Sequence, residues 1–182
     1  LNPAAPAAPA AGTRRDARRG RGGKGYLNIL FNATGIAEAA RKMTVRMGIP
    51  NKGRLNERAV ELLVRSGVDL GEDWGRRLYV TAEDQDLEVL FLRAQDIPAF
   101  INAGAIDFGI TGEDMVAESG HPLRRVAGLG FGICRLSIAA PEASGVVDAQ
   151  SIPDGVRIAT SFPNLTAAFV GSLGKEATIV GV

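Results

Sequence analysis

Short apolar runs recur along the chain from residue 44 onward, and segments with helical spacing of apolar residues lie between them. The runs have the length and the branched or aromatic residues that are typical of buried strands. The predicted strands are 45–49, 77–81, 89–92, 108–110, 125–129, 136–140, 156–159 and 177–182, and the predicted helices lie at 56–67, 96–104, 111–120 and 165–173. Strands that alternate with helices in this way predict an α/β fold with mainly parallel sheets.

The predicted helices carry residues that commonly start and stop helices. Asn56 is expected to cap the first helix and Gly67 to end it. Asp96 is expected to cap the second, with Pro98 in the first turn, where a missing N–H has no consequence. Residues 111–114, Thr-Gly-Glu-Asp, are expected to form a capping box that opens the third helix.

Residues 1–42 differ from the rest of the chain because they are rich first in Pro and Ala and then in Arg and Gly. They hold 8 Lys and Arg against 2 Asp and Glu, and we expect this low-complexity basic extension to be disordered. Three interpretations are open: an arm that binds nucleic acid or membrane, a transit-like targeting segment, or a stretch foreign to the protein. We favour the third, because the composition changes abruptly at Met43.

The overall composition is that of an ordinary soluble globular protein, since 46% of the 182 residues are hydrophobic and 23% are charged. No apolar stretch is long enough to span a membrane. The formal net charge of +1 hides a difference of sign between two parts of the chain, because the extension carries about +6 and residues 43–182 about −5.

Cys134 is the only cysteine, which excludes an intrachain disulfide and favours a reducing compartment. We expect it to pack as a small hydrophobic residue. A catalytic thiol would need a histidine nearby, and the only histidine, His121, lies in a predicted loop. The acidic run at 83–88 is interpreted as a solvated connection rather than a metal site, so no metal-ligating residue is predicted.

A basic turn, Lys52-Gly53-Arg54, follows the first predicted strand and precedes the first predicted helix. Junctions of this kind often bind phosphate in α/β proteins. Lys52 and Arg54 supply positive charge, and Gly53 lets the backbone approach an oxygen atom because it has no Cβ. The alternative is that the two basic side chains are only the solvated ends of a turn.

Five segments occur in a characteristic order and spacing: IPNKGRL at 49–55, RAQDIP at 93–98, DFGITG at 107–112, GFGICRL at 130–136 and ATSFPNL at 159–165. Together they resemble the ATP phosphoribosyltransferase family, which catalyses the first step of histidine biosynthesis. The resemblance covers residues 43–182, and the extension has no counterpart in it.

The resemblance implies two α/β lobes like those of type II periplasmic binding proteins, with substrates bound between the lobes. Residues 43–135 would form the first lobe and residues 136–182 part of an incomplete second lobe, with the crossing near 130–141. The implied reaction joins the phosphoribosyl group of phosphoribosyl pyrophosphate to N1 of ATP and releases pyrophosphate, with Mg²⁺ as cofactor. The resemblance also implies a cytoplasmic homo-oligomer, with either a separate regulatory subunit or a C-terminal regulatory domain.

The chain ends within the predicted strand 177–182, so we expect the sequence to be truncated at its C-terminus. The phosphoribosyl-binding loop of the family would then follow Val182, and the fragment would bind nucleotide weakly or fail to turn over. The alternative function is a non-catalytic small-ligand-binding protein of similar fold, which would bind a ligand without forming a product.

Carried over by position, Lys52 and Arg54 would be catalytic, because fixed positive charge stabilises a reaction between two polyanions. The implied substrate-binding residues are Gly53, Arg93, Asp96, Thr111, Gly112, Ser161, Pro163 and Asn164. Two alternatives are open among them. Asp96 either accepts a hydrogen bond from the adenine amino group or only caps a helix, and Thr111 with Gly112 either binds phosphate or only opens a helix.

Overall fold

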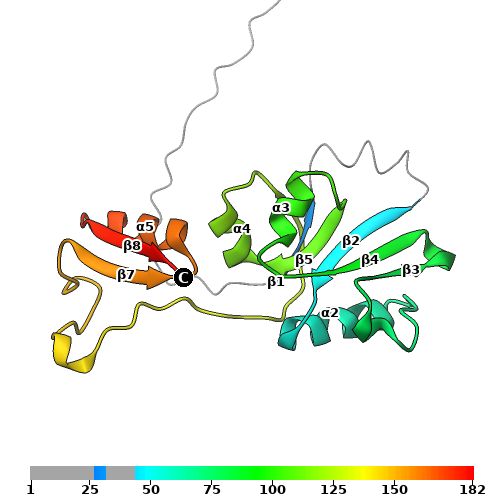
Figure 1. Ribbon diagram of the computed structural model, residues 1–182, viewed down its shortest axis with the longest axis horizontal. Helices are drawn as coiled ribbons and strands as arrows, with labels where there is room; N and C mark the ends of the chain where they lie inside the picture. Colours follow the sequence, from blue (N-terminus) through cyan, green and yellow to red (C-terminus); the bar gives the residue numbers. More distant parts are fainter. Residues whose placement is uncertain (1–26, 32–43) are drawn as a thin grey trace, which may run out of the picture.

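The structure is a computed structural model that describes residues 27–31 and 44–182. These residues form two lobes, each with helices packed on a sheet, joined by a long connection (Figure 1). The sheet of the first lobe contains β1 (Leu27–Phe31), β2 (Val45–Pro50), β3 (Tyr79–Ala82), β4 (Leu87–Leu92), β5 (Phe108–Gly112) and β6 (Arg124–Gly128). The sheet of the second lobe contains β7 (Val156–Thr160) and β8 (Ala177–Gly181).

The first sheet has the strand order β3-β4-β2-β5-β1-β6. Its centre is parallel, because β2 pairs in parallel with both β4 and β5. The strand β3 pairs antiparallel with β4 at one edge, and β1 lies antiparallel between β5 and β6. Four strands, β4, β2, β5 and β6, therefore run in one direction, and the predicted α/β fold with mainly parallel sheets is confirmed.

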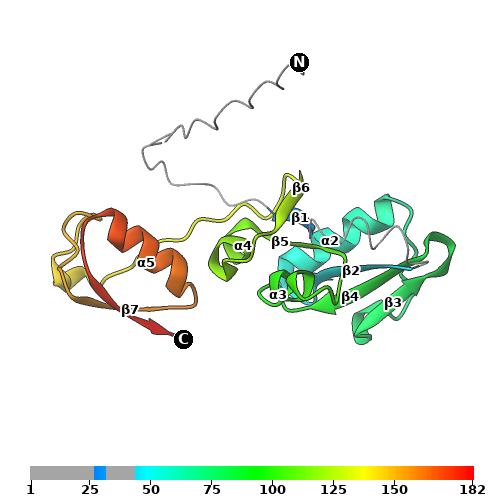
Figure 2. The same ribbon diagram turned by 90° about the horizontal axis from the view of Figure 1, so that it is seen from above.

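Helices cover both faces of the first sheet (Figure 2). The face with α2 (Gly53–Arg65) is filled by a cluster that includes Ile49, Val89 and Ile110 of the central strands. The opposite face carries α3 (Ile97–Asn102) and α4 (Glu113–Ser119), and α3 buries Ile97 and Ile101 there. Since fully burying one such side chain contributes about 1.5–3 kcal/mol, the sheet is held from both sides.

The second lobe is smaller. The parallel strands β7 and β8 carry α5 (Pro163–Ser172), and among the described residues of this lobe the buried hydrophobic side chains are Ile152 and Val170. Residues 129–155 connect the two sheets and contain a single 3-10 turn, η3 (Glu142–Ser144). The strand β6 thus precedes the predicted boundary at 135/136, and β7 follows it.

The predicted strand at 136–140 is wrong, because this segment is extended without a partner strand in the described part of the chain. Leu136 and Ile138 remain 48% and 39% exposed. An apolar run forms a strand only where a neighbouring strand accepts its backbone hydrogen bonds. The remaining predicted strands from residue 44 onward all form, with ends shifted by a few residues at most.

The expected disorder of residues 1–42 does not hold throughout, since Leu27–Phe31 forms β1 inside the first sheet. The rest of that extension lies outside the described residues, as does Met43. No helix in the ranges 27–31 and 44–182 has both the length and the apolar character needed to cross a bilayer.

Candidate functional site

The carboxyl ends of the three parallel strands β2, β4 and β5 meet at one edge of the first sheet, on the side where the second lobe lies (Figure 1). Pro50 of β2 is paired with Leu92 of β4, and the Asn51 N–H donates to the Leu92 carbonyl oxygen at 2.7 Å. The loops that follow β2 and β4 are therefore directly joined. In open α/β sheets, this edge is where ligands bind.

The basic turn lies at this edge, and α2 begins within it. Lys52 occupies the N-cap position with an extended backbone, and Gly53 has φ +75°, a conformation that favours glycine. Lys52, Gly53 and Arg54 are all exposed. Asn56 is not the cap predicted from the sequence: it is buried in the first turn, and its Nδ2 donates to the Pro50 carbonyl oxygen at 2.7 Å. This bond fixes the turn against the end of β2.

The electrostatic environment of this edge is positive. The first turn of α2 contains no acidic residue, so the partial positive charge of the helix N-terminus adds to Lys52 and Arg54. Arg93, immediately after β4, contributes a third exposed cation. Within the described ranges, none of these three side chains forms an ion pair with a carboxylate, and all three are therefore available to an anionic ligand.

The Arg93–Asp96 loop turns tightly, because the Asp96 N–H donates to the Arg93 carbonyl oxygen at 2.9 Å. Asp96 occupies the predicted N-cap position of α3, but its carboxylate makes no hydrogen bond to the N–H groups of the helix. The Asp96 side chain therefore does not cap α3. The half-buried carboxylate is left at the same edge as the basic turn.

Thr111 is fully buried, and its hydroxyl donates to the Ala94 carbonyl oxygen at 2.7 Å. The predicted capping box is wrong, because Thr111 belongs to β5 and Gly112 is the N-cap of α4, with no side-chain cap. Thr111 therefore fixes the Arg93–Asp96 loop to β5. A Cβ atom on Gly112 would lie 2.0 Å from Asp114 Oδ1, so a side chain at this position would displace the Asp114 carboxylate.

The predicted residues of the second lobe lie around the first turn of α5. The Ser161 hydroxyl donates to the Val182 carbonyl oxygen at 3.2 Å, and Pro163 is the first residue of the helix. Asn164 bonds to Glu118 of α4: its N–H donates to Oε1 and its Nδ2 to the Glu118 carbonyl oxygen, both at 2.8 Å. The Leu165 N–H donates to Glu118 Oε2 at 2.9 Å.

Glu118 is thus a residue that sequence analysis missed, and it links the two lobes. Its carboxylate accepts two of the N–H groups that a helix leaves unpaired at its start. The partners are 46 and 47 positions apart, and no local pattern signals such a contact. The ends of β2, β4 and β5 are therefore linked by the Asn51–Leu92 and Thr111–Ala94 hydrogen bonds. Asn164 of the second lobe is attached to α4.

Cys134 does not pack as a small hydrophobic residue, as the sequence led us to expect; it is exposed in the connection between the lobes. Its thiol donates to Asp114 Oδ2 at 3.5 Å. Partial desolvation, followed by the negative charge and the hydrogen bond of Asp114, raises the pKa of this thiol. A raised pKa disfavours the nucleophilic thiolate, so the arrangement is unsuited to thiol catalysis.

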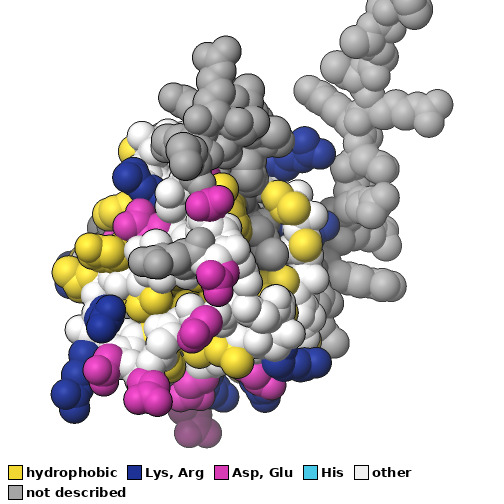
Figure 3. Space-filling model, turned by 90° about the vertical axis from the view of Figure 1, so that its right-hand side faces the viewer, with side chains coloured by type: hydrophobic (Ala, Val, Ile, Leu, Met, Phe, Trp, Pro, Cys, Tyr) yellow, Lys and Arg dark blue, Asp and Glu magenta, His cyan; other side chains and the backbone are white. Residues whose placement is uncertain are grey.

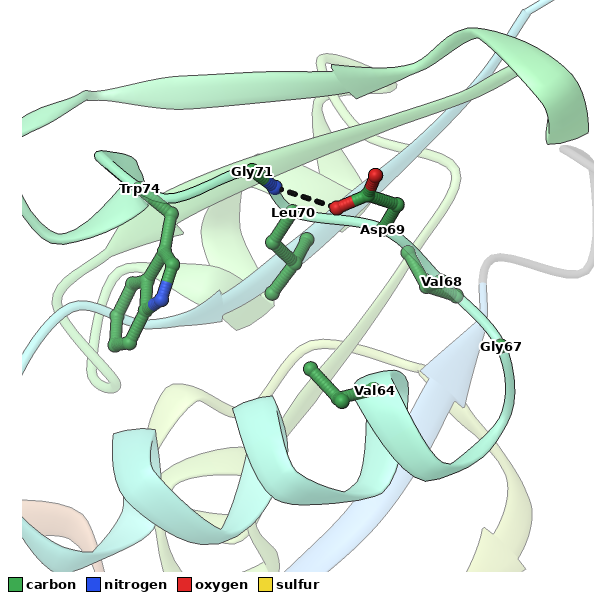
Figure 4. Close-up of a pocket in the computed structure, with 7 residues that line it drawn as sticks. All are labelled: Val64, Gly67, Val68, Asp69, Leu70, Gly71 and Trp74. Atoms are coloured by element: carbon green, nitrogen blue, oxygen red, sulfur yellow. Dashed lines mark hydrogen bonds between the residues drawn. The ribbon is translucent and has the colours of Figure 1, made fainter.

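A hollow of about 330 Å³ lies elsewhere, between α2 and the segment 67–74 (Figure 4). Val64 near the end of α2 and Trp74 contribute to its lining, and the Trp74 ring stacks on Phe91 at 5.6 Å between ring centroids. Because Lys52 stands at the opposite end of α2, this hollow is separate from the basic turn. Across the described residues, no group of three His, Cys, Asp or Glu side chains is placed to hold a metal ion.

Two α/β lobes with ligand-accessible loops at the carboxyl ends of parallel strands define a two-lobed protein of the periplasmic-binding-protein type. Residues 93–182 match the family model described as HisG, ATP phosphoribosyltransferase. The ATP phosphoribosyltransferases of Methanopyrus kandleri and Natronomonas pharaonis are 40% and 42% identical to the chain, each over 138 residues. Over residues 93–182 the chain is thus similar to the ATP phosphoribosyltransferase family.

These matches cover 76% of the chain but only 48% and 49% of the two relatives, so the chain spans about half the length of the curated relatives it matches. Among solved structures, the ATP phosphoribosyltransferase (HisG:HisZ) complex from Thermotoga maritima matches with a TM-score of 0.63 and 28% identity. That match covers 76% of the chain and 64% of the solved chain.

Proposed function

We propose that the protein containing this chain transfers the phosphoribosyl group of phosphoribosyl pyrophosphate to N1 of ATP and releases pyrophosphate, the first step of histidine biosynthesis. The main support is a set of exposed cations at the carboxyl edge of the first sheet, Lys52, Arg54 and Arg93, which form no ion pair with any carboxylate of the described residues. They lie on loops joined by the Asn51–Leu92 hydrogen bond. The match of residues 93–182 to the family model and the similarity to the curated relatives support the choice of reaction.

The chemistry requires positive charge and orientation more than proton transfer. The C1–N1 bond forms as the bond between C1 and the pyrophosphate oxygen breaks, and the electron pair leaves with pyrophosphate. Adenine N1 carries a free lone pair, so no base is needed before the attack. Lys52 and Arg54 would stabilise the charge on the phosphates, and holding the substrates in line would contribute the remaining acceleration.

The other residues have narrower roles in this proposal. Gly53 admits a phosphate oxygen close to the backbone, and Arg93 adds charge on the neighbouring loop. Asp96 accepts a hydrogen bond from the adenine amino group, since its carboxylate is not used by α3. Thr111 holds the loop that contains Asp96, and Gly112 leaves room for the Asp114 carboxylate at the start of α4. The turn that contains Ser161, Pro163 and Asn164 would contribute from the second lobe.

Magnesium would arrive with the phosphates of the substrates, whose charge it partly neutralises when bound. The described residues offer no cluster of three ligating side chains that would hold the ion by themselves. We therefore assign no step of the chain's own chemistry to the metal.

The proposal also includes the cellular compartment and the assembly of the enzyme. We infer a cytoplasmic homo-oligomer, consistent with the single cysteine. The similar solved chain from Thermotoga maritima belongs to a HisG:HisZ complex, and we extend from it the proposal of a separate regulatory subunit.

The test measures pyrophosphate release by the protein that contains this chain, with both substrates and Mg²⁺. Replacing Lys52 and Arg54 together by Ala is expected to lower kcat by a factor on the order of 100 to 1,000, as loss of charge-stabilising groups does elsewhere. Arg58→Ala is the matched control, because Arg58 lies on the same helix and pairs with Glu61 at 2.8 Å.

Two outcomes would contradict the proposal: no release of pyrophosphate by the unaltered protein, or equal losses in the double variant and the control. Saturable nucleotide binding without product would support the alternative of a non-catalytic ligand-binding protein. Asp96→Asn is expected to raise the KM for ATP while leaving the melting temperature unchanged, because its carboxylate makes no cap.

A further inference from the structure

The helix α4 lies on the side of the first lobe that faces the second lobe, next to α5 (Figure 1 and Figure 2). Among the described elements, the most extensive packing between the two lobes is that of α4 against α5. The covalent connection, residues 129–155, is long and contains a single 3-10 turn. Because such a connection permits many placements of the second lobe, the contacts made by α4 decide which placement is adopted.

Two carboxylates of α4 contact the second lobe and its connection. Asp114 and Glu118 are four residues apart, so they lie on the same face of the helix. Asp114 Oδ2 accepts a hydrogen bond from the Cys134 thiol of the connection at 3.5 Å. The two carboxylate oxygens of Glu118 accept the N–H groups of Asn164 and Leu165. The helix therefore holds the connection with one residue and the start of α5 with the next residue on the same face.

The use of these two carboxylates differs from that of charged side chains elsewhere in the first lobe. Figure 3 views the end of this lobe that is turned away from the second lobe, and acidic and basic side chains lie interspersed there. Glu113 of α4 is exposed and pairs with Arg125 of β6, within the first lobe. Asp114 and Glu118 are half-buried, and neither forms an ion pair within the described residues. Their oxygens are used between the lobes instead.

The contact between α4 and α5 also relates the carboxyl edges of the two sheets. The helix α4 begins directly after β5, and α5 begins directly after the turn that follows β7. Glu118 lies about 9 Å along the helix axis from Gly112, at 1.5 Å per residue. A short helix thus serves as a spacer between the loops of the candidate site and the Ser161 turn of the second lobe.

We propose that Glu118 and Asn164 are positioning residues, through which α4 fixes the second-lobe turn 160–163 relative to the basic turn of the first lobe. This inference rests on the proposed function, in which both turns serve one reaction. Asn164 donates its backbone N–H and its side-chain amide to Glu118, so it acts through this contact rather than by holding a substrate. A misplacement of about 1 Å can lower a rate on the order of 100-fold, so a contact away from the reacting atoms can govern kcat.

The first test separates kcat from KM in the protein that contains this chain. Glu118→Ala is expected to lower kcat for pyrophosphate release by about 10-fold and to leave the KM for ATP within about 2-fold, because the proposed ATP contacts belong to the first lobe. Glu113→Ala is the matched control on the same helix and should leave both constants unchanged. Since kcat is expressed per folded protein, measured by circular dichroism, a loss of folded protein alone does not change it.

A cross-link between the lobes tests the positioning directly. Glu118→Cys with Asn164→Cys, made together with Cys134→Ser, replaces two residues in direct contact by thiols that should form a disulfide on oxidation. The reduced form should be as slow as Glu118→Ala, and the oxidised form should return to within about 3-fold of the unaltered kcat. Glu113→Cys with Asn164→Cys is the control pair and should form no disulfide, because Glu113 contacts Arg125 instead.

Three results would overturn the proposal: a kcat of Glu118→Ala equal to that of the Glu113→Ala control, a raised KM for ATP with unchanged kcat, or a Glu118 and Asn164 cysteine pair that forms no disulfide or stays slow when cross-linked. Disulfide formation does not depend on activity. If the unaltered protein released no pyrophosphate, the proposed function would fail. A disulfide in the Glu118 pair alone would still support the attachment of α5 to α4, and its absence would overturn it.

Discussion

In the first lobe, α3 starts with a proline in its first turn and buries Ile97 and Ile101 completely; in the second lobe, α5 starts with a proline as well but buries only Val170. The difference lies in what each helix packs against. Beneath α3 is a six-stranded sheet with α4 beside it, whereas α5 has only the two-stranded sheet of β7 and β8, with α4 of the first lobe against it, in the described part of the chain. The same strand-turn-helix pattern is therefore held by apolar packing in one lobe and left half-exposed in the other.

Polar contacts take a larger share in the second lobe. Glu118 holds the start of α5, and Lys175 Nζ donates to the carbonyl oxygens of Gln150 and Ile152 at the other end of the lobe. Hydrogen bonds of this kind each contribute about 0.5–1.5 kcal/mol, less than a buried Ile side chain. The first lobe should accordingly be the more stable unit, and the position of α5 should depend on a few side chains.

The largest expected effect is a cavity in the first lobe. Ile101→Ala removes a fully buried side chain from the cluster under α3 and is expected to lower the free energy of unfolding by about 2–5 kcal/mol. Val170→Ala in α5 removes fewer atoms from a smaller cluster and should cost less. Denaturant unfolding can be followed by Trp74, the only tryptophan, which stacks on Phe91 in the first lobe.

Ile138→Ala serves as the control, because this side chain is 39% exposed and has no strand partner. Equal losses for Ile101→Ala and Ile138→Ala would contradict the idea that the first lobe is held by packing on both faces.

Two glycines, one in each lobe, test the difference in packing between the lobes with a smaller expected change in stability. A Cβ atom on Gly109 would lie 2.6 Å from Ile97 Cγ2 and 3.0 Å from the Gly48 carbonyl oxygen, so Gly109→Ala is expected to cost about 1–3 kcal/mol. Gly171, in α5, has nothing within 4 Å of the added atom. Gly171→Ala is expected to stabilise the helix by about 0.5–1 kcal/mol. The melting temperatures of the two variants should move in opposite directions, and a shift in the same direction would contradict the packing difference.

The link between the lobes should give a smaller and local effect. Glu118→Ala leaves the N–H groups of Asn164 and Leu165 without their carboxylate partner, a loss of about 1 kcal/mol for a helix start. Amide hydrogen exchange should accelerate at these two positions and stay unchanged at Ile101. Glu113→Ala is the control on the same helix, since Glu113 makes only an exposed ion pair with Arg125 at 3.6 Å. Unchanged exchange in the Glu118 variant would show that α5 does not depend on this contact.

The same contrast explains what the sequence could predict. Strands of the first lobe were predictable because the run 89–92 is apolar throughout and the run 45–49 is apolar except for Arg46, close to what burial on both faces of a sheet requires. The run at 136–140 has similar composition and forms no strand, because strand formation needs a partner that a local pattern does not contain. The insertion of Leu27–Phe31 into the sheet was missed for the same reason.

The candidate site was likewise predictable only in part. The positions of Lys52, Arg54 and Arg93 follow from the rule that parallel strands share their carboxyl edge, so the sequence predicted where they lie. The partners of Thr111 and Asn164 depend on contacts between distant segments, with Ala94 and Glu118 respectively. Local capping rules therefore misassigned Thr111 and gave no hint of Glu118.

The smallest expected effect concerns the connection between the lobes, where Cys134 donates to Asp114 at the start of α4. Because desolvation and the Asp114 charge raise the thiol pKa, the thiol stays protonated to higher pH, and alkylation by iodoacetamide near pH 8 should be slower than in the urea-unfolded chain. Asp114→Asn removes the nearby charge but not the desolvation, so it should recover part of that rate and shift the rate profile to lower pH. Equal rates in the folded and unfolded chain would show that the connection does not hold this thiol against α4.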